Sequence, residues 1–84
     1  MHRYLVMLLR QPQFEPAVVP RHLQYLEQQR AQGRIELSGP FGDASGGAYL
    51  LRANDLDEAL GVAHADPAHL SGGWRVAVYE WRAR

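Results

Sequence analysis

Three short segments carry side chains suited to acid–base chemistry on a small molecule. His22 lies in Arg-His-Leu, Asp66 precedes a proline in Ala-Asp-Pro, and the third segment is Ser38-Gly39-Pro40. A histidine beside a carboxylate is a general acid–base arrangement, because the carboxylate fixes the imidazole tautomer and stabilises the imidazolium. We therefore predict His22 and Asp66 as a catalytic pair and the Ser-Gly-Pro segment as part of the substrate-binding site.

Structural roles are the alternative for the same residues. His22 can cap local backbone groups, and Asp66 can accept amide hydrogen bonds at a turn. Ser38 can complete a nucleophilic triad with His22 and Asp66, although a serine before Gly-Pro is far more often part of a turn.

A metal is a further alternative around Asp66. His64, Asp66 and His69 form the pattern H-x-D-x-x-H, which has enough nitrogen and oxygen ligands for zinc or another divalent ion. The spacing crosses a helix end and a proline and matches no standard ligand motif. We assign no metal and no cofactor, and interpret His64 as a solvated residue at a helix end.

The hydrophobic pattern predicts four strands. Apolar and β-branched residues favour strands over residues 3–10, 34–39, 48–53 and 74–81. Residues 34–39 should place Ile35 and Leu37 on one face and Glu36 and Ser38 on the other. The second and third strands then form a hairpin with a loop longer than the two-residue type.

The first helix is expected over about residues 20–32, after a proline-rich loop over residues 11–20. Pro20 fits its first turn and Gly33 its end. Helical spacing makes an apolar stripe, which places His22 one position off the stripe and half buried at its edge. The residues of this stripe are Val19, Leu23 and Leu26.

The second helix should begin at a capping box made by Asp55 and Glu58. Asp66-Pro67 closes it, because proline disfavours helical geometry in the residue before it. Asp66 is thereby held extended at the end of the helix.

The order strand, helix, strand, strand, helix, strand is the ferredoxin-like pattern of the α+β class. It predicts an antiparallel sheet in the order 4-1-3-2 with both helices on one face. The start of the first helix, the end of the second strand and the end of the second helix then meet at one edge. His22, Ser38-Gly39-Pro40 and Asp66 lie at those three points.

The first and last strands are apolar on both faces, yet the two helices cover only one face of the sheet. An exposed apolar sheet face indicates an interface, and a homodimer packed through this sheet face is the simplest answer. The aromatic residues of the strands are expected in the core or at this interface.

The 84 residues, 46% of them apolar, suit a single domain over residues 1–84. The chain has no cysteine, and its opening apolar run is short, flanked by arginine and lacks a cleavage site, so we expect a cytoplasmic protein. Nine basic residues balance nine acidic ones, which makes nucleic acid an unfavourable partner. No apolar run is long enough to span a membrane.

Arg21 and Arg75 are candidates for binding an anionic substrate, although surface arginines are mostly only solvated.

The segments RHLQYLEQQRAQGRIELSGP and ADPAHLSGGWRVAVYEW resemble the YciI-like (YCII-related) family, and the resemblance covers nearly the whole chain. It implies a ferredoxin-like fold, dimers of the α+β barrel type, and a His-Asp active-site dyad at His22 and Asp66. A few such relatives are linked to the breakdown of chlorinated aromatic compounds.

One position departs from the family pattern, because Ala68 stands where a large aromatic residue is expected after Asp-Pro. This change either opens the pocket or moves its wall to Phe41, Phe14 or Trp74. We include Phe41 among the expected substrate-binding residues.

The sequence thus predicts a small enzyme acting on a small organic molecule, aromatic or lactone-like, by His/Asp acid–base chemistry. Lyase, isomerase and dehalogenase-like reactions all fit such a pair. The alternative is a non-catalytic dimeric domain that binds a small ligand or serves a larger pathway.

Overall fold

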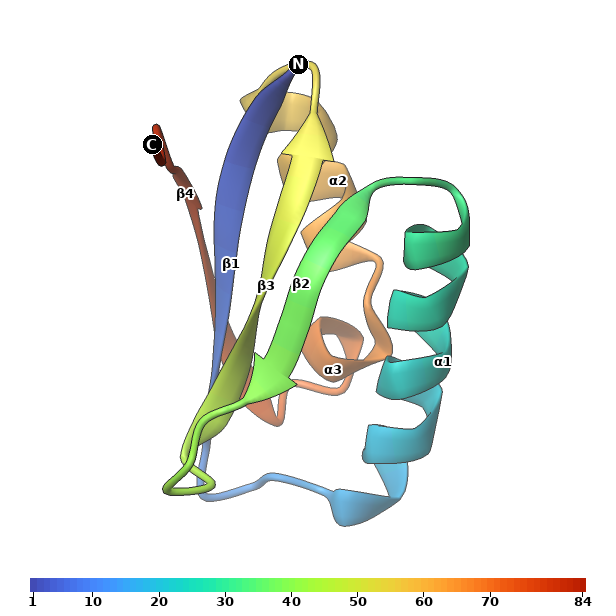
Figure 1. Ribbon diagram of the computed structural model, residues 1–84. Coiled ribbons are helices and arrows are strands. Elements are labelled where there is room, and N and C mark those ends of the chain that lie inside the picture. The colour runs from blue at the N-terminus through green and yellow to red at the C-terminus, as the bar shows by residue number, and fades with distance from the viewer.

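The computed structural model describes residues 1–84, and its main elements follow the predicted order (Figure 1). Two short helices, η1 and α3, were not expected from the sequence. The elements are β1 (His2–Arg10), η1 (Pro16–Val18), α1 (Val19–Ala31), β2 (Ile35–Pro40), β3 (Gly46–Ala53), α2 (Leu56–His64), α3 (Pro67–Leu70) and β4 (Trp74–Glu80).

The four strands form one antiparallel sheet in the order β2-β3-β1-β4, which is the predicted order counted from the other edge. All of the helices lie on the same side of this sheet (Figure 1). This is the predicted ferredoxin-like α+β fold, the protomer fold of the dimeric α+β barrel type. None of the helices combines the length and the apolar content that crossing a bilayer requires.

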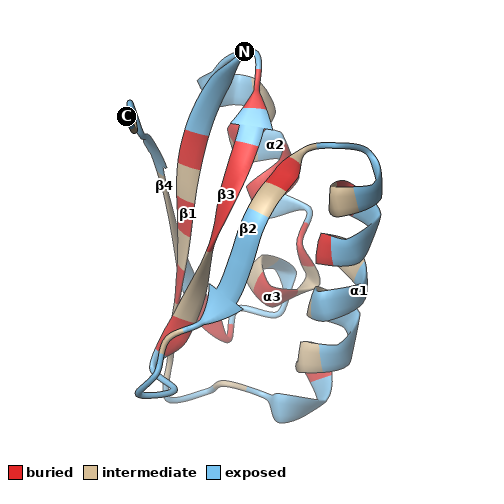
Figure 2. Cartoon of the chain, viewed as in Figure 1, coloured by how far each residue is buried: buried red, intermediate tan, exposed pale blue.

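The core lies between the sheet and the helices, as the buried segments in Figure 2 show. In β1, Tyr4, Val6 and Leu8 alternate towards this core and are almost fully buried. The intervening residues face the other side of the sheet, here called the open face, which no element of the chain covers. Its side chains include Leu5, Met7, Leu9, Leu37, Leu50 and Tyr79.

A β-bulge changes the predicted faces of β2. The register with β3 shifts between Ile35, which pairs with Leu51, and Leu37, which pairs with Leu50. Because a bulge adds one residue to a strand, it reverses the alternation beyond it. The prediction that Ile35 and Leu37 share a face is therefore wrong: Ile35 is in the core and Leu37 is 68% exposed on the open face. Ser38 instead turns to the helix side, opposite the buried Tyr49.

The inward stripe of α1 also differs from the prediction. Leu23 is 53% exposed, whereas Leu26 and Gln29 are buried. His22 precedes these two residues by four and seven positions, a spacing that places all three on one helical face. His22 thus lies in the inward stripe and not one position off it.

The connections before α1 and after α2 are more regular than expected. The proline-rich loop contains η1, which leads directly into α1. Asp66 ends the turn after α2, as predicted, and is also the N-cap of α3, which the sequence did not indicate.

Candidate active site

Asp66 is held in place by the backbone at a junction between two helices. Its φ of −64° and ψ of 130° are extended, as expected before proline. Its Oδ1 accepts a hydrogen bond from the Ala68 amide at 2.9 Å, which caps the first turn of α3. The carboxylate is fully buried, so its remaining hydrogen-bonding capacity must be met inside the protein.

His22 supplies the second donor to this carboxylate. Its Nδ1 lies 2.8 Å from Oδ1 and 2.7 Å from Oδ2 of Asp66, so the expected contact between the two side chains is present. Because a carboxylate only accepts, Nδ1 carries the hydrogen, and Nε2 is left without a partner in the protein. The His22 side chain is 16% exposed and Asp66 is not exposed at all.

A cavity of about 360 Å³ opens beside His22, between α1 and the sheet. Its size is within the range of small-molecule sites. The predicted residues Ser38, Gly39 and Pro40 all contribute to its wall, whereas Phe41 does not. The complete lining is Leu8, Arg10, Val19, His22, Leu23, Leu26, Ser38, Gly39, Pro40, Gly46, Gly47, Ala48, Tyr49 and Trp74.

A row of packed side chains supports one wall. The Trp74 ring faces the His22 imidazole at an interplanar angle of 26°, with centroids 6.4 Å apart. Phe14 packs edge-on against Trp74 at 4.7 Å, and the Arg10 guanidinium lies over the Phe14 ring at 4.3 Å. Of the three aromatic residues predicted as pocket wall, Trp74 lines the cavity directly and Phe14 supports it from behind.

Ser38 is not hydrogen bonded to His22. Its hydroxyl instead accepts a hydrogen bond from the Arg30 guanidinium, at the edge of the cavity. The contact that a Ser-His-Asp triad requires is therefore absent from this structure.

The three residues of the H-x-D-x-x-H pattern do not gather into a metal-binding set. The His64 and His69 rings stack on each other with centroids 4.4 Å apart. Asp66 turns away into the protein towards His22. The Asp66 carboxylate thus bonds to His22, and His64 and His69 contact only each other in this group.

Tyr49 is a part of the site that the sequence did not single out. It is 2% exposed and lines the cavity, yet its hydroxyl has no hydrogen-bond partner. Burial raises the pKa of this hydroxyl, and the negative charge of Asp66 raises it further, so Tyr49 stays neutral. Its strand position suggested a residue of the core or of the dimer interface, because an alternating pattern does not show whether a hydroxyl finds a partner.

The fold and this pair define a small α+β protein with a cavity whose wall includes a histidine bonded to a buried carboxylate. The chain belongs to the YCII-related domain family, whose model matches residues 3–82.

Two individual proteins are similar to it. The uncharacterised protein YjpA of Bacillus subtilis (strain 168) is 37% identical over 84 residues, which cover all of this chain and 99% of YjpA. Among solved structures, the 5-chloro-2-hydroxyhydroquinone dehydrochlorinase TftG of Burkholderia phenoliruptrix AC1100, in complex with 2,5-dihydroxybenzoquinone, superposes with a TM-score of 0.73. It is 22% identical, and the match covers 98% of this chain and 95% of TftG, which establishes a shared fold.

Proposed function

We propose that the protein is a small enzyme that acts on a small organic molecule by acid–base chemistry. His22 is the general acid–base and Asp66 is its orienting partner. The observation that carries this proposal is the hydrogen bond from His22 Nδ1 to a fully buried carboxylate, which leaves Nε2 free at a cavity wall. The similar fold of TftG, a dehydrochlorinase in complex with a quinone, supports an aromatic or related cyclic substrate.

The geometry gives each group a defined role in proton transfer. Nε2 accepts a proton from a substrate bound in the cavity, which turns the imidazole into an imidazolium. The Asp66 carboxylate stabilises this cation through the bond to Nδ1 without itself taking the proton. The same imidazolium then returns the proton to another atom or to a leaving group, as isomerases and lyases require. Apolar walls at Leu8, Leu26 and Trp74 limit the water around the reacting atoms.

The second candidate is a non-catalytic domain that binds a small ligand in the same cavity. The cavity and the unpartnered Nε2 serve binding as well as catalysis. We favour the enzyme because a binding pocket has less need of a histidine fixed in one tautomer.

We also propose a homodimer through the open face and, from the lack of cysteine, a cytoplasmic location.

Asp66→Asn is the sharpest test of the catalytic role. An asparagine caps helices as well as an aspartate does, so α3 is retained. Its amide donates where the carboxylate accepted, which forces the His22 hydrogen onto Nε2 and removes the stabilisation of the imidazolium. We expect turnover to fall by about 100-fold or more, with the melting temperature little changed.

His22→Gln is the second variant, and His64→Gln is its matched control because His64 is exposed and lies outside the cavity. His22→Ala is less suitable: it leaves a buried carboxylate without its partner, and this costs several kcal/mol, about 3 or more. Activity is assayed first on 5-chloro-2-hydroxyhydroquinone and related hydroxyquinones. Full turnover in folded Asp66→Asn and His22→Gln proteins would exclude the catalytic role of this pair, and binding without any turnover would favour the ligand-binding domain.

A further inference from the structure

The cavity contains one fixed positive charge. Besides His22 and the neutral phenol of Tyr49, Arg10 is the only ionisable side chain in its lining. Arg21 and Arg75, which the sequence suggested as anion-binding residues, do not line the cavity. The rest of the wall is apolar or consists of small residues.

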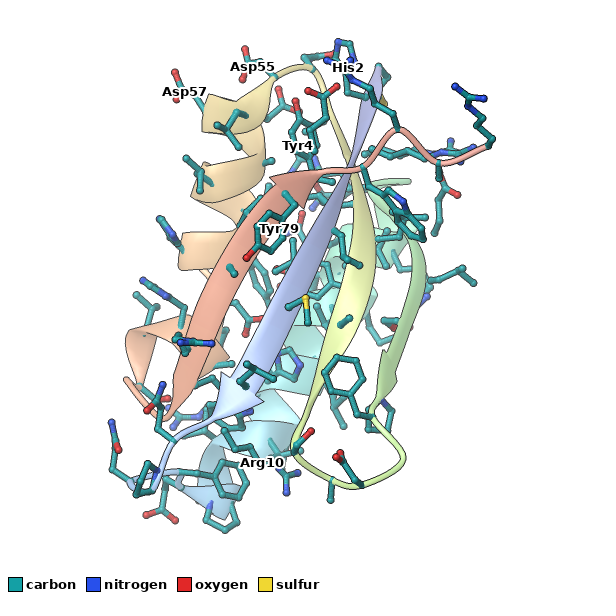
Figure 3. All side chains as sticks on the ribbon, turned by 90° about the vertical axis from the view of Figure 1, so that its left-hand side faces the viewer. His2, Tyr4, Arg10, Asp55, Asp57 and Tyr79 are labelled. Atoms are coloured by element: carbon teal, nitrogen blue, oxygen red, sulfur yellow. The ribbon has the colours of Figure 1, made fainter.

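Arg10 is held in position from two sides. It is the last residue of β1, where its amide donates to the Ser45 carbonyl at 2.9 Å and its Cα lies opposite Trp74 in β4. Figure 3 shows Arg10 at this end of the strand. The side chain stacks on Phe14, which in turn packs on Trp74. Stacking on an aromatic face restricts a guanidinium to a plane and leaves its edge donors free.

These donors have no acceptor within the protein. The carboxylates that form ion pairs do so with other residues, and Arg10 takes part in none of these pairs. Nor does its side chain make a hydrogen bond. A guanidinium that is oriented but unpaired at a cavity wall is suited to a planar anionic group, which it binds with two parallel hydrogen bonds.

We infer that Arg10 is a specificity-determining residue, which binds an anionic oxygen group such as a carboxylate on the ligand of this cavity. The inference rests on the proposed function, because it places the ring of the ligand against Trp74 and its reacting atom beside Nε2 of His22. The preferred ligands are therefore small cyclic or aromatic acids, with the acidic group at the Arg10 end of the row Arg10, Phe14, Trp74 and His22.

The test uses two probes that differ in charge and hardly in shape, 4-hydroxybenzoate and 4-hydroxybenzamide. Their affinities are measured by isothermal titration calorimetry or by NMR titration at low ionic strength. We expect the wild-type protein to bind the acid about tenfold more tightly than the amide. Arg10→Gln should remove this preference and leave the affinity for the amide within about twofold, since a rim charge contributes little to a neutral ligand.

Arg21→Gln is the matched control, because it removes the same charge from an exposed residue next to His22 that does not line the cavity. It should keep the preference for the acid. Arg10→Lys keeps the charge without the flat fork, so a reduced but measurable preference is expected. The melting temperatures of all three variants are compared with that of the wild type.

Three results of the affinity comparison would overturn the role of Arg10. These are equal affinity for the two probes in the wild type, an unchanged preference in Arg10→Gln, or an equal loss of preference in Arg21→Gln. Absence of binding of both probes would also contradict it. None of these results touches the proposed acid–base chemistry, which the turnover of Asp66→Asn and His22→Gln decides. Conversely, if only Arg10→Gln loses the preference for the acid, the role of Arg10 stands even if Asp66→Asn and His22→Gln keep full activity.

Discussion

Asp66 has three roles in this corner of the molecule, one through its backbone and two through its side chain. Its extended backbone ends the segment after α2, its Oδ1 caps α3, and both carboxylate oxygens face Nδ1 of His22. A fully buried carboxylate is costly unless its hydrogen bonds are made, and here a backbone amide and an imidazole make them. The orientation of His22 is therefore fixed by the same interactions that fold this corner of the molecule.

The Tyr49 hydroxyl leads to a prediction about stability. It is buried without a partner, and such a group costs free energy in the folded state. We expect Tyr49→Phe to leave the free energy of unfolding unchanged or to raise it by about 1 kcal/mol. Urea denaturation followed by circular dichroism measures the change.

Tyr25→Phe is the matched control for this prediction. The Tyr25 hydroxyl donates to the Val62 carbonyl at 2.7 Å, so the same chemical change breaks a hydrogen bond and should lower stability by about 1 kcal/mol. A loss of stability in Tyr49→Phe as large as that in Tyr25→Phe would show that the Tyr49 hydroxyl has a partner in solution.

The His22-Asp66 pair and the Ser-Gly-Pro segment could be placed together from the sequence, because topology alone brings helix ends and strand ends to one edge. Topology placed only the backbones of His22 and Asp66 at one edge, and the contact between their side chains is a finding of the structure. Arg10 and Tyr49 could not be identified in the same way. Their importance depends on a missing ion pair and a missing hydrogen bond, and neither is visible in a pattern of residue types.

At the scale of elements, the close approach of β1 and β3 shapes the cavity. Gly46 is the first residue of β3 and lines the cavity. A Cβ atom added to Gly46 would lie 1.9 Å from the carbonyl oxygen of Leu8. The added Cβ is bonded directly to the backbone of β3 and the oxygen belongs to the backbone of β1, so no side-chain movement can relieve the contact. Only glycine allows the strands to approach this closely.

Gly46→Ala is therefore expected to lower the free energy of unfolding by about 2 kcal/mol or more, because the two strands must separate. Gly42→Ala in the hairpin loop that precedes β3 is the control, since a Cβ there meets nothing within 4 Å. Thermal unfolding of the two variants compares them directly. Equal melting temperatures for both would contradict the close approach of β1 and β3.

The order and type of the main elements were predictable because their hydrophobic periods are long and regular. The errors concern local irregularities that a period does not contain. The bulge near Glu36 reversed the faces of Leu37 and Ser38, and the inward stripe of α1 passes through His22 and not through Leu23. The bulge matters for the site, since it turns Ser38 towards the cavity.

At the scale of the whole molecule, the open face is an apolar surface that no element of the chain covers. Leu37 on β2 is 68% exposed and Tyr79 on β4 is 57% exposed, and Trp81 just beyond β4 is 49% exposed. Figure 3 looks onto this face, with Tyr79 towards the viewer. On β1, Leu5, Met7 and Leu9 contribute further apolar side chains between these edges. A contiguous apolar surface of this kind favours a partner over water.

We predict that a second copy of the chain covers the open face. A symmetric dimer pairs the same surface of both subunits, and a sheet face with apolar residues on all its strands is suited to this. Static light scattering at micromolar concentration should give twice the chain mass of 9.5 kDa. A stable monomer under these conditions would exclude the dimer.

Leu37→Asp tests which surface is responsible. Leu37 is already exposed in the single chain, so the charge should not disturb folding, but it would be buried without a partner between two sheets. We expect this variant to be monomeric or to associate at least about tenfold more weakly. Leu70→Asp is the matched control, because Leu70 is 71% exposed and lies on α3, on the helix side of the sheet. Dissociation by Leu70→Asp and not by Leu37→Asp would place the interface on the helices, where it would cover the site and not the sheet.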